Sequence, residues 1–169
     1  CCEGGTRVPF FMQLPGVIAP GSQFTAPVSH FDIFATSAAL AGVQPPADRV
    51  IDGVNLIPFA RGEQGGRPHE QMFWRSGAYQ VARSGDWKLQ VNETQDKVWL
   101  FNLQDDPTEQ HNLVDAEPAR VKELLAQLAE FNSQQKAPLW PSLVEAPILI
   151  DKPLNRPQTI DDEFIYWSN

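Results

Sequence analysis

The sequence predicts an α/β protein, with α+β organisation in this chain: a small four-stranded antiparallel sheet covered by a C-terminal helix. Four runs rich in aromatic and branched residues follow one another through short connections, as expected for strands. The runs are 71–75, 79–83, 87–91 and 98–103. Apolar residues then recur at helical spacing from Val121 to Phe131. Because such a sheet must cover its apolar face, this helix is expected to lie on it.

The composition is that of an ordinary globular domain, with 169 residues of which 42% are apolar. The formal net charge is -8, from 21 acidic and 13 basic residues. This balance argues against a nucleic-acid partner, because no basic run could replace the counterions of a phosphate backbone. No apolar stretch reaches the roughly 20 residues that a membrane span needs.

The first 66 residues predict a strand, a helix and a connector. Residues 8–14 are apolar and are followed by Pro-Gly, which favours a buried strand that must join a sheet; in this chain it is expected to be an orphan strand that exposes apolar surface. Residues 29–41 read as a mostly buried helix, with Ser29 and Asp32 spaced as a capping box and Gly42 as the stop. Residues 44–67 are rich in proline, glycine and charge and predict a surface connector.

The last 33 residues, 137–169, contain five prolines and no strong period, so an extended tail is expected. The tail ends in an aromatic cluster of Phe164, Tyr166 and Trp167. These rings either dock on the body of the same chain, which we favour, or reach a neighbouring subunit and give a homo-oligomer.

A series of short motifs runs through the chain between Glu3 and Phe131. In order they are Glu-Gly-Gly-Thr-Arg-Val-Pro at 3–9, Leu-Pro-Gly at 14–16, Ser-His-Phe-Asp at 29–32, Asp-Gly-Val-Asn-Leu at 52–56, His-Glu at 69–70, Phe-Trp-Arg at 73–75, Arg-Ser-Gly-Asp-Trp-Lys-Leu at 83–89, Leu-Phe-Asn-Leu at 100–103, Asp-Pro-Thr-Glu at 106–109 and Asn-Leu at 112–113. Each motif alone is weak. In this order and spacing they resemble the C-terminal part of the sulfatase family.

The resemblance implies an alkaline-phosphatase-like fold, in which a large mixed sheet carries the active site and a small antiparallel sheet packs beside it. On this basis residues 1–66 are expected to be the C-terminal end of the large catalytic domain. Residues 67–136 would form the small sheet with its helix, and 137–169 the tail.

The resemblance also implies a chemistry whose parts lie outside this sequence. Sulfatases use a formylglycine made from Cys or Ser in a C/S-x-P-x-R context, together with a divalent cation, usually calcium, that holds the sulfate oxygens. No C/S-x-P-x-R occurs here, and Cys1 and Cys2 lack that context. We therefore assign no catalytic, cofactor-binding or metal-binding residue. The sulfate-binding lysine of the family would lie just before Cys1, which places Glu3 near the active site.

Glu3 and His69 are the two residues expected at the rim of the substrate cleft, the second because loops on a rigid scaffold often set specificity. A satisfied structural histidine is the alternative for His69. His30 and Asp32 are read as helix capping and not as part of a triad. Three tryptophans, Trp74, Trp87 and Trp99, are expected in the core of the sheet.

An acidic group could be taken for a calcium or transition-metal site but is read as a turn after the fourth strand, because no Gly-centred loop or second ligand cluster accompanies it. Its members are Asp105, Asp106, Glu109 and His111.

The resulting hypothesis is that the intact protein hydrolyses sulfate monoesters and that this chain alone is inactive. Its partners would be a sulfated small molecule or carbohydrate and the missing N-terminal part of the same protein. A phosphodiesterase or phosphonate hydrolase of the same superfamily is one alternative, because fold does not decide between them. A non-catalytic interaction module is the other. The sequence leaves the cellular location undecided: by analogy with bacterial sulfatases the protein could be periplasmic or secreted, and a cytoplasmic location is the alternative.

Overall fold

The computed structural model describes residues 3–137 and, beyond them, 139, 145–149, 156–157, 159–160, 162 and 164–168. The chain forms two compact units. Residues 1–8 and 71–169 make up one, called here the sheet unit, and residues 9–70 make up the other, called the loop unit. The expected limits at 66/67 and 136/137 concern domains of an intact enzyme and stay predictions.

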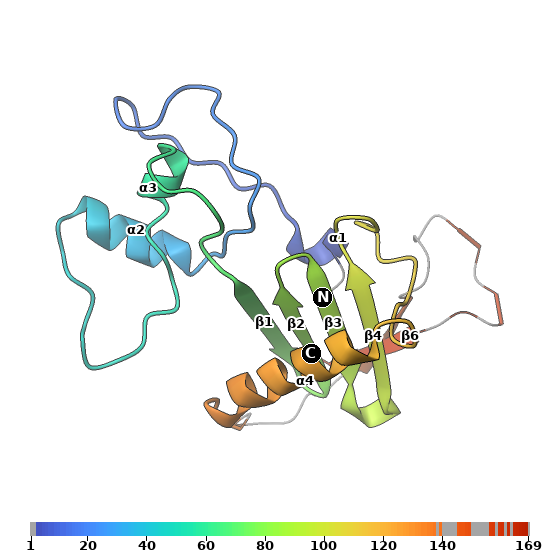
Figure 1. Ribbon diagram of the computed structural model, residues 1–169. Helices are drawn as coiled ribbons and strands as arrows, with labels where there is room; N and C mark the ends of the chain where they lie inside the picture. Colours follow the sequence, from blue (N-terminus) through green and yellow to red (C-terminus); the bar gives the residue numbers. More distant parts are fainter. Residues whose placement is uncertain are drawn as a thin grey trace. The chain divides into compact units, whose positions relative to one another are not determined.

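The sheet unit contains the four predicted strands in an antiparallel meander of order β1-β2-β3-β4 (Figure 1). The strands are β1 (Gln71–Ser76), β2 (Tyr79–Ser84), β3 (Trp87–Asn92) and β4 (Lys97–Asn102). Tight turns join the first three, and Gly77 and Gly85 take up φ angles of 58° and 60° there, which glycine adopts without steric cost. A short 3-10 helix, η1 (Glu93–Gln95), joins β3 to β4. The strand predictions are confirmed.

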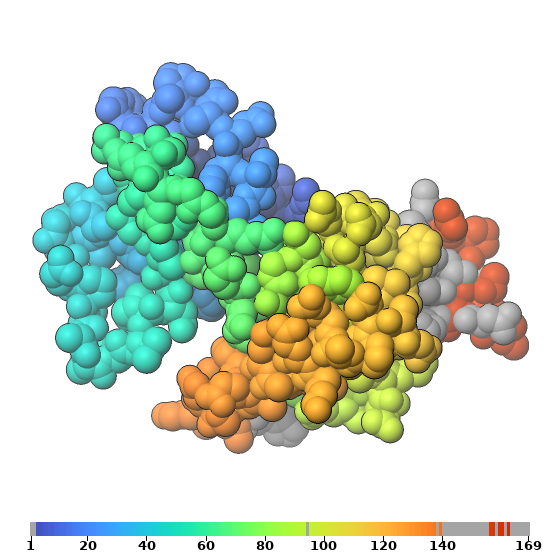
Figure 2. All heavy atoms as spheres, in the orientation of Figure 1, coloured from blue at the N-terminus to red at the C-terminus, as the bar shows by residue number. Residues whose placement is uncertain are grey.

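Helix α4 (Pro118–Ser133) covers one face of this sheet, as predicted (Figure 1). Leu124 and Leu128 are 0% and 4% exposed and pack on Ala82, Leu89 and Leu100. In the space-filling view the atoms of α4, in orange, lie directly on the sheet (Figure 2). Burying a leucine side chain of this kind stabilises the fold by about 1.5–3 kcal/mol.

The opposite face of the sheet is also buried, which the sequence analysis did not predict. Tyr79, Val81, Trp99 and Phe101 form a second apolar cluster there, each at most 2% exposed. On this face the central strand β3 presents polar residues, and Lys88 and Gln90 are both 0% exposed. The short helix α1 (Glu3–Thr6) is attached to this polar row.

The loop unit holds two short helices, α2 (Asp32–Leu40) and α3 (Ile57–Ala60), the second within the predicted connector. Helix α2 was expected to be mostly buried, which is wrong. Ile33, Phe34 and Leu40 are 51%, 54% and 52% exposed, whereas Asp32 is completely buried. The reason is that the described contacts of α2 inside its unit lie on one side, where Asp32 and Thr36 bond the 54–56 segment.

Residues 8–14 do not form the predicted strand, although most of their apolar side chains are exposed, as expected of a segment without its sheet. They are irregular, and Val8, Phe10 and Phe11 are 67%, 48% and 91% exposed. A strand requires a neighbouring strand for its backbone groups, and within the described residues none pairs with this segment.

The tail is not wholly extended, because β5 (Glu145–Leu149) and β6 (Phe164–Ser168) pair as antiparallel strands. Strand β6 lies near β2 of the same unit. The side chains of the aromatic cluster lie outside what the structure describes, so their docking and a homo-oligomer stay predictions.

Among the described residues, no helix has both the length and the apolar character of a membrane span.

Candidate functional site

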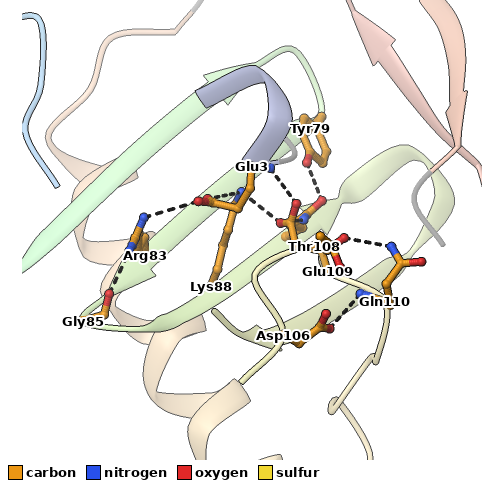
Figure 3. Close-up of polar contacts among 10 residues, drawn as sticks. Glu3, Tyr79, Arg83, Gly85, Lys88, Asp106, Thr108, Glu109 and Gln110 are labelled. Atoms are coloured by element: carbon orange, nitrogen blue, oxygen red, sulfur yellow. Dashed lines mark hydrogen bonds and ion pairs between the residues drawn. The ribbon is translucent and has the colours of Figure 1, made fainter. Parts of the chain in front are cut away.

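Glu3, one of the two candidate rim residues, begins α1 and is only 6% exposed. Its carboxylate accepts a hydrogen bond of 2.9 Å from Lys88 Nζ on β3, and Arg83 Nη1 on β2 lies 3.7 Å away (Figure 3). Its backbone N–H donates to Glu109 Oε2 at 2.6 Å. Both the main chain and the side chain of Glu3 are therefore held by residues that follow it by at least 80 positions.

Glu109 closes this arrangement from the loop after β4 (Figure 3). Its Oε1 is 2.9 Å from Lys88 Nζ and accepts a 2.7 Å hydrogen bond from Gln90 Nε2. Tyr79 Oη in turn donates to Gln90 Oε1 at 2.5 Å. These residues, Glu3, Arg83, Lys88, Gln90 and Glu109, are called the Glu3 cluster below.

The Glu3 cluster balances two carboxylates against two cations inside the protein. Lys88 is 0% and Glu109 3% exposed, so neither charge is solvated by bulk water and each depends on its partners. Removing one partner of such a buried pair costs about 3–5 kcal/mol, because the other charge is left uncompensated. Because Lys88 lies 2.9 Å from an oxygen of each carboxylate, the cluster is suited to bracing.

His69, the second candidate, is held by Asp32 in the loop unit. His69 Nε2 lies 2.8 Å from Asp32 Oδ1 and 3.0 Å from Oδ2. The His69 side chain is 13% exposed and that of Asp32 0%. This geometry agrees with the alternative interpretation, a histidine satisfied by a structural partner.

Asp32 also accepts from two backbone N–H groups. Ser29 N–H donates to Oδ2 at 2.7 Å and Val54 N–H to Oδ1 at 2.8 Å. The first contact is half of the predicted capping box. The other half is absent among the described contacts, since the Asp32 N–H bonds the Ser29 carbonyl at 3.0 Å and the Ser29 hydroxyl is bonded by Phe31 N–H. Ser29, Asp32, Val54 and His69 form what is called the Asp32 cluster below.

The other side chains considered in the sequence also have structural roles. Among the described contacts His30 makes no hydrogen bond to Asp32, and its ring lies 4.1 Å from that of Phe31, centroid to centroid. Asp106 Oδ2 accepts from the backbone N–H groups of Gln110 and His111 at 2.7 and 2.8 Å, which is the turn expected there. Of the three tryptophans expected in the core, Trp99 is 1% exposed, whereas Trp74 and Trp87 are partly buried and pack against the two apolar clusters.

The described residues offer no metal site, since no group of three or more His, Cys, Asp or Glu side chains is placed to hold an ion. A hollow of about 550 Å³ in the loop unit is lined by 17, 19, 22–24, 59–62, 64 and 65. Phe24 and Phe59 meet there with ring centroids 5.9 Å apart. Neither Glu3 nor His69 lines this hollow.

Residues 2–137 match the family described as N-sulphoglucosamine sulphohydrolase, C-terminal. The chain belongs to this sulfatase family. The match includes both clusters and the whole four-stranded sheet, so the sulfatase resemblance of the motifs is confirmed.

Known sulfatases are similar to this chain in sequence. Steryl-sulfatase of Rattus norvegicus is 40% identical over 105 residues, which is 62% of this chain and 18% of that protein. This chain therefore matches less than a fifth of the length of that relative.

Solved structures show the same fold. A Bacteroides thetaiotaomicron protein from work on glycosaminoglycan metabolism matches with a TM-score of 0.65 and 25% identity, over 78% of this chain and 30% of that one. Ps i-CgsB, solved also in complex with k-i-k-neocarrahexaose, matches with a TM-score of 0.64 and 26% identity, over 75% and 29%. The predicted fold class, the C-terminal part of an alkaline-phosphatase-like sulfatase, is confirmed.

Lys88 was not among the candidate residues, and Glu109 was considered only as part of an acidic turn, whereas both belong to the buried Glu3 cluster. Both stand in motifs already singled out, at 83–89 and 106–109, together with Glu3 at 3–9. For Lys88 the sequence held a usable signal, since its charge stands between Trp87 and Leu89 in a predicted strand; Glu109, in the polar segment 106–111, had none.

Proposed function

We propose that the intact protein hydrolyses sulfate monoesters and that this chain supplies the C-terminal part of the enzyme. Membership of the sulfatase family over residues 2–137 carries the proposal. Residues 1–66 are then the end of the large catalytic domain, 67–136 the small sheet with its helix, and 137–169 the tail. The chain by itself is inactive, because it contains no C/S-x-P-x-R nucleophile.

The reacting groups belong to the N-terminal part of the same protein in this proposal. The formylglycine would supply the nucleophile. A divalent cation, which the family implies to be calcium, would stabilise the charge on the sulfate group. The described residues do not fit such a cation, so no step is assigned to them. The residues immediately before Glu3 would line the active site.

Glu3 and His69 lie, in this proposal, behind the rim of the substrate cleft and support residues that touch substrate. The support for this is their burial and pairing: the Glu3 carboxylate is bound by Lys88, and the His69 ring by Asp32. A sulfated carbohydrate and a sulfated small molecule are both compatible substrates. The named relatives and neighbours include a steryl-sulfatase and a protein solved in complex with k-i-k-neocarrahexaose.

The test is an assay of the full-length enzyme against matched esters. We expect hydrolysis of para-nitrophenyl sulfate, loss of that activity with a calcium chelator and recovery with added calcium, and no activity for residues 1–169 alone. Para-nitrophenyl phosphate and bis(para-nitrophenyl) phosphate serve as controls. Turnover of the phosphate diester with none of the sulfate would replace the proposal by the phosphodiesterase alternative.

A further inference from the structure

Glu3 is held by the small sheet through both its main chain and its side chain. The N–H of Glu3 donates to Glu109 Oε2 at 2.6 Å, and the side-chain carboxylate of the same residue accepts a hydrogen bond from Lys88 at 2.9 Å. Lys88 Nζ is also 2.9 Å from Glu109 Oε1, so one ammonium group joins both anchors. Together the contacts define the position of the main chain at residue 3 and the direction of its N–H bond.

Stability alone is a poor explanation for these contacts. A buried charged group of this kind can often be replaced by apolar residues at no loss of stability, because desolvation offsets the Coulomb attraction. Glu109 in addition has a φ of 58°, a left-handed conformation that is unfavourable for a residue with a side chain. In return for the cost of desolvation and of the backbone strain at Glu109, the contacts hold the segment that begins at Glu3 in a single geometry.

We propose that Lys88 and Glu109 are positioning residues of the sulfatase, which act through Glu3 to hold the residues just before it in their working geometry. This inference rests on the proposed function, in which those preceding residues line the active site. The small sheet, which contains no reacting group among its described residues, thereby becomes part of what sets the turnover rate. A displacement of about 1 Å at a reacting group can cost on the order of a hundredfold in rate.

The decisive experiment measures kcat and KM of the full-length Lys88→Met enzyme with para-nitrophenyl sulfate, at a temperature where the enzyme is folded. Methionine matches the unbranched four-atom stem of lysine and removes the ammonium group. We expect kcat to fall by roughly tenfold or more and KM to change by less than about threefold, the pattern of a lost transition-state interaction.

Leu124→Ala is the matched control, because Leu124 is 0% exposed and packs on the other face of the same sheet, away from Glu3. It should lower the melting temperature at least as much as Lys88→Met and leave kcat per folded enzyme within about twofold, since a core truncation acts on folding and not on the site. Equal loss of kcat in the two variants would overturn the inference and reduce the cluster to a structural brace.

Glu109→Gln is the second variant, in case Lys88→Met does not fold. It keeps an acceptor for the Glu3 N–H group and removes the charge that faces Lys88, so an intermediate loss of kcat is expected. Faster hydrogen exchange of the 3–8 peptide than of α4 in this variant would support positioning. A Glu109→Gln enzyme with wild-type kcat and exchange would contradict it, whereas a wild-type enzyme inactive on all sulfate esters would overturn the proposed function itself.

Discussion

Asp32 has no exposed side-chain surface, and a buried carboxylate must find donors for its oxygens within the protein. It finds them in Ser29, Val54 and His69, from three separate stretches of the loop unit. The sequence could nominate Asp32 as a helix-start residue because Ser29 is near. It could not give Val54 or His69 as partners, since these lie 22 and 37 positions away.

Gly53, next to one of these partners, is expected to tolerate no side chain. A Cβ added there would lie 2.7 Å from the carbonyl carbon of Phe31 and closer still to its oxygen. Gly53→Ala should therefore lower the free energy of unfolding by about 1–3 kcal/mol, as crowding of a packed backbone does. Denaturant unfolding of the full-length enzyme measures this.

Gly65→Ala is the control, because a Cβ at Gly65 meets nothing within 4 Å. It should be neutral or slightly stabilising. Equal stability of the two variants would show that the Phe31 carbonyl is not held close to Gly53.

At the scale of elements, local patterns were sufficient to predict the four strands and α4, because residue types in neighbouring positions of the sequence carry the strand and helix signals. They failed for 8–14 and for the burial of α2, because both depend on what packs against the segment from elsewhere. The second buried face of the sheet was missed for a related reason. Its polar row on β3 is compensated by Glu3 and Glu109, which are distant in sequence.

Neighbouring leucines on α4 give a sharp test of which side of that helix carries the packing. Leu124 is 0% exposed and Leu125 37%. Leu124→Ala should cost about 2–5 kcal/mol in the free energy of unfolding, the range for a truncated core leucine, and Leu125→Ala should cost much less. Similar losses in the two variants, measured by denaturant unfolding, would mean that α4 lies on the sheet in a different rotation.

For the whole molecule, the chain order and the compact units do not coincide. The sheet unit is made from residues 1–8 and 71–169, and the loop unit is inserted between them in sequence. The loop unit has few large apolar side chains inside and several outside. On α2 the large apolar side chains are exposed and the one charged residue is buried, the reverse of the pattern of an ordinary surface helix.

Residues 1–169 expressed alone should consequently self-associate. Helix α2 exposes three large apolar side chains, Ile33, Phe34 and Leu40. Such a group of exposed apolar residues marks a surface that tends to associate, unlike the single apolar residues found on most protein surfaces. We expect concentration-dependent elution in size-exclusion chromatography, reduced by Phe34→Glu. Val50→Lys, at a residue that is 86% exposed outside α2, is the control and should change little. A compact monomer at all concentrations would contradict this expectation.

The contact between Glu3 and Glu109 also has a consequence for how the protein is made. Its two residues are 106 positions apart, so at a synthesis rate of roughly 5–20 residues per second the ribosome completes Glu109 about 5–20 s after Glu3. The meander β1 to β4 joins neighbours in sequence and can form as it emerges. Helix α1 can dock only after the loop beyond β4 has left the exit tunnel, so until then Glu3 lacks its contact with Glu109.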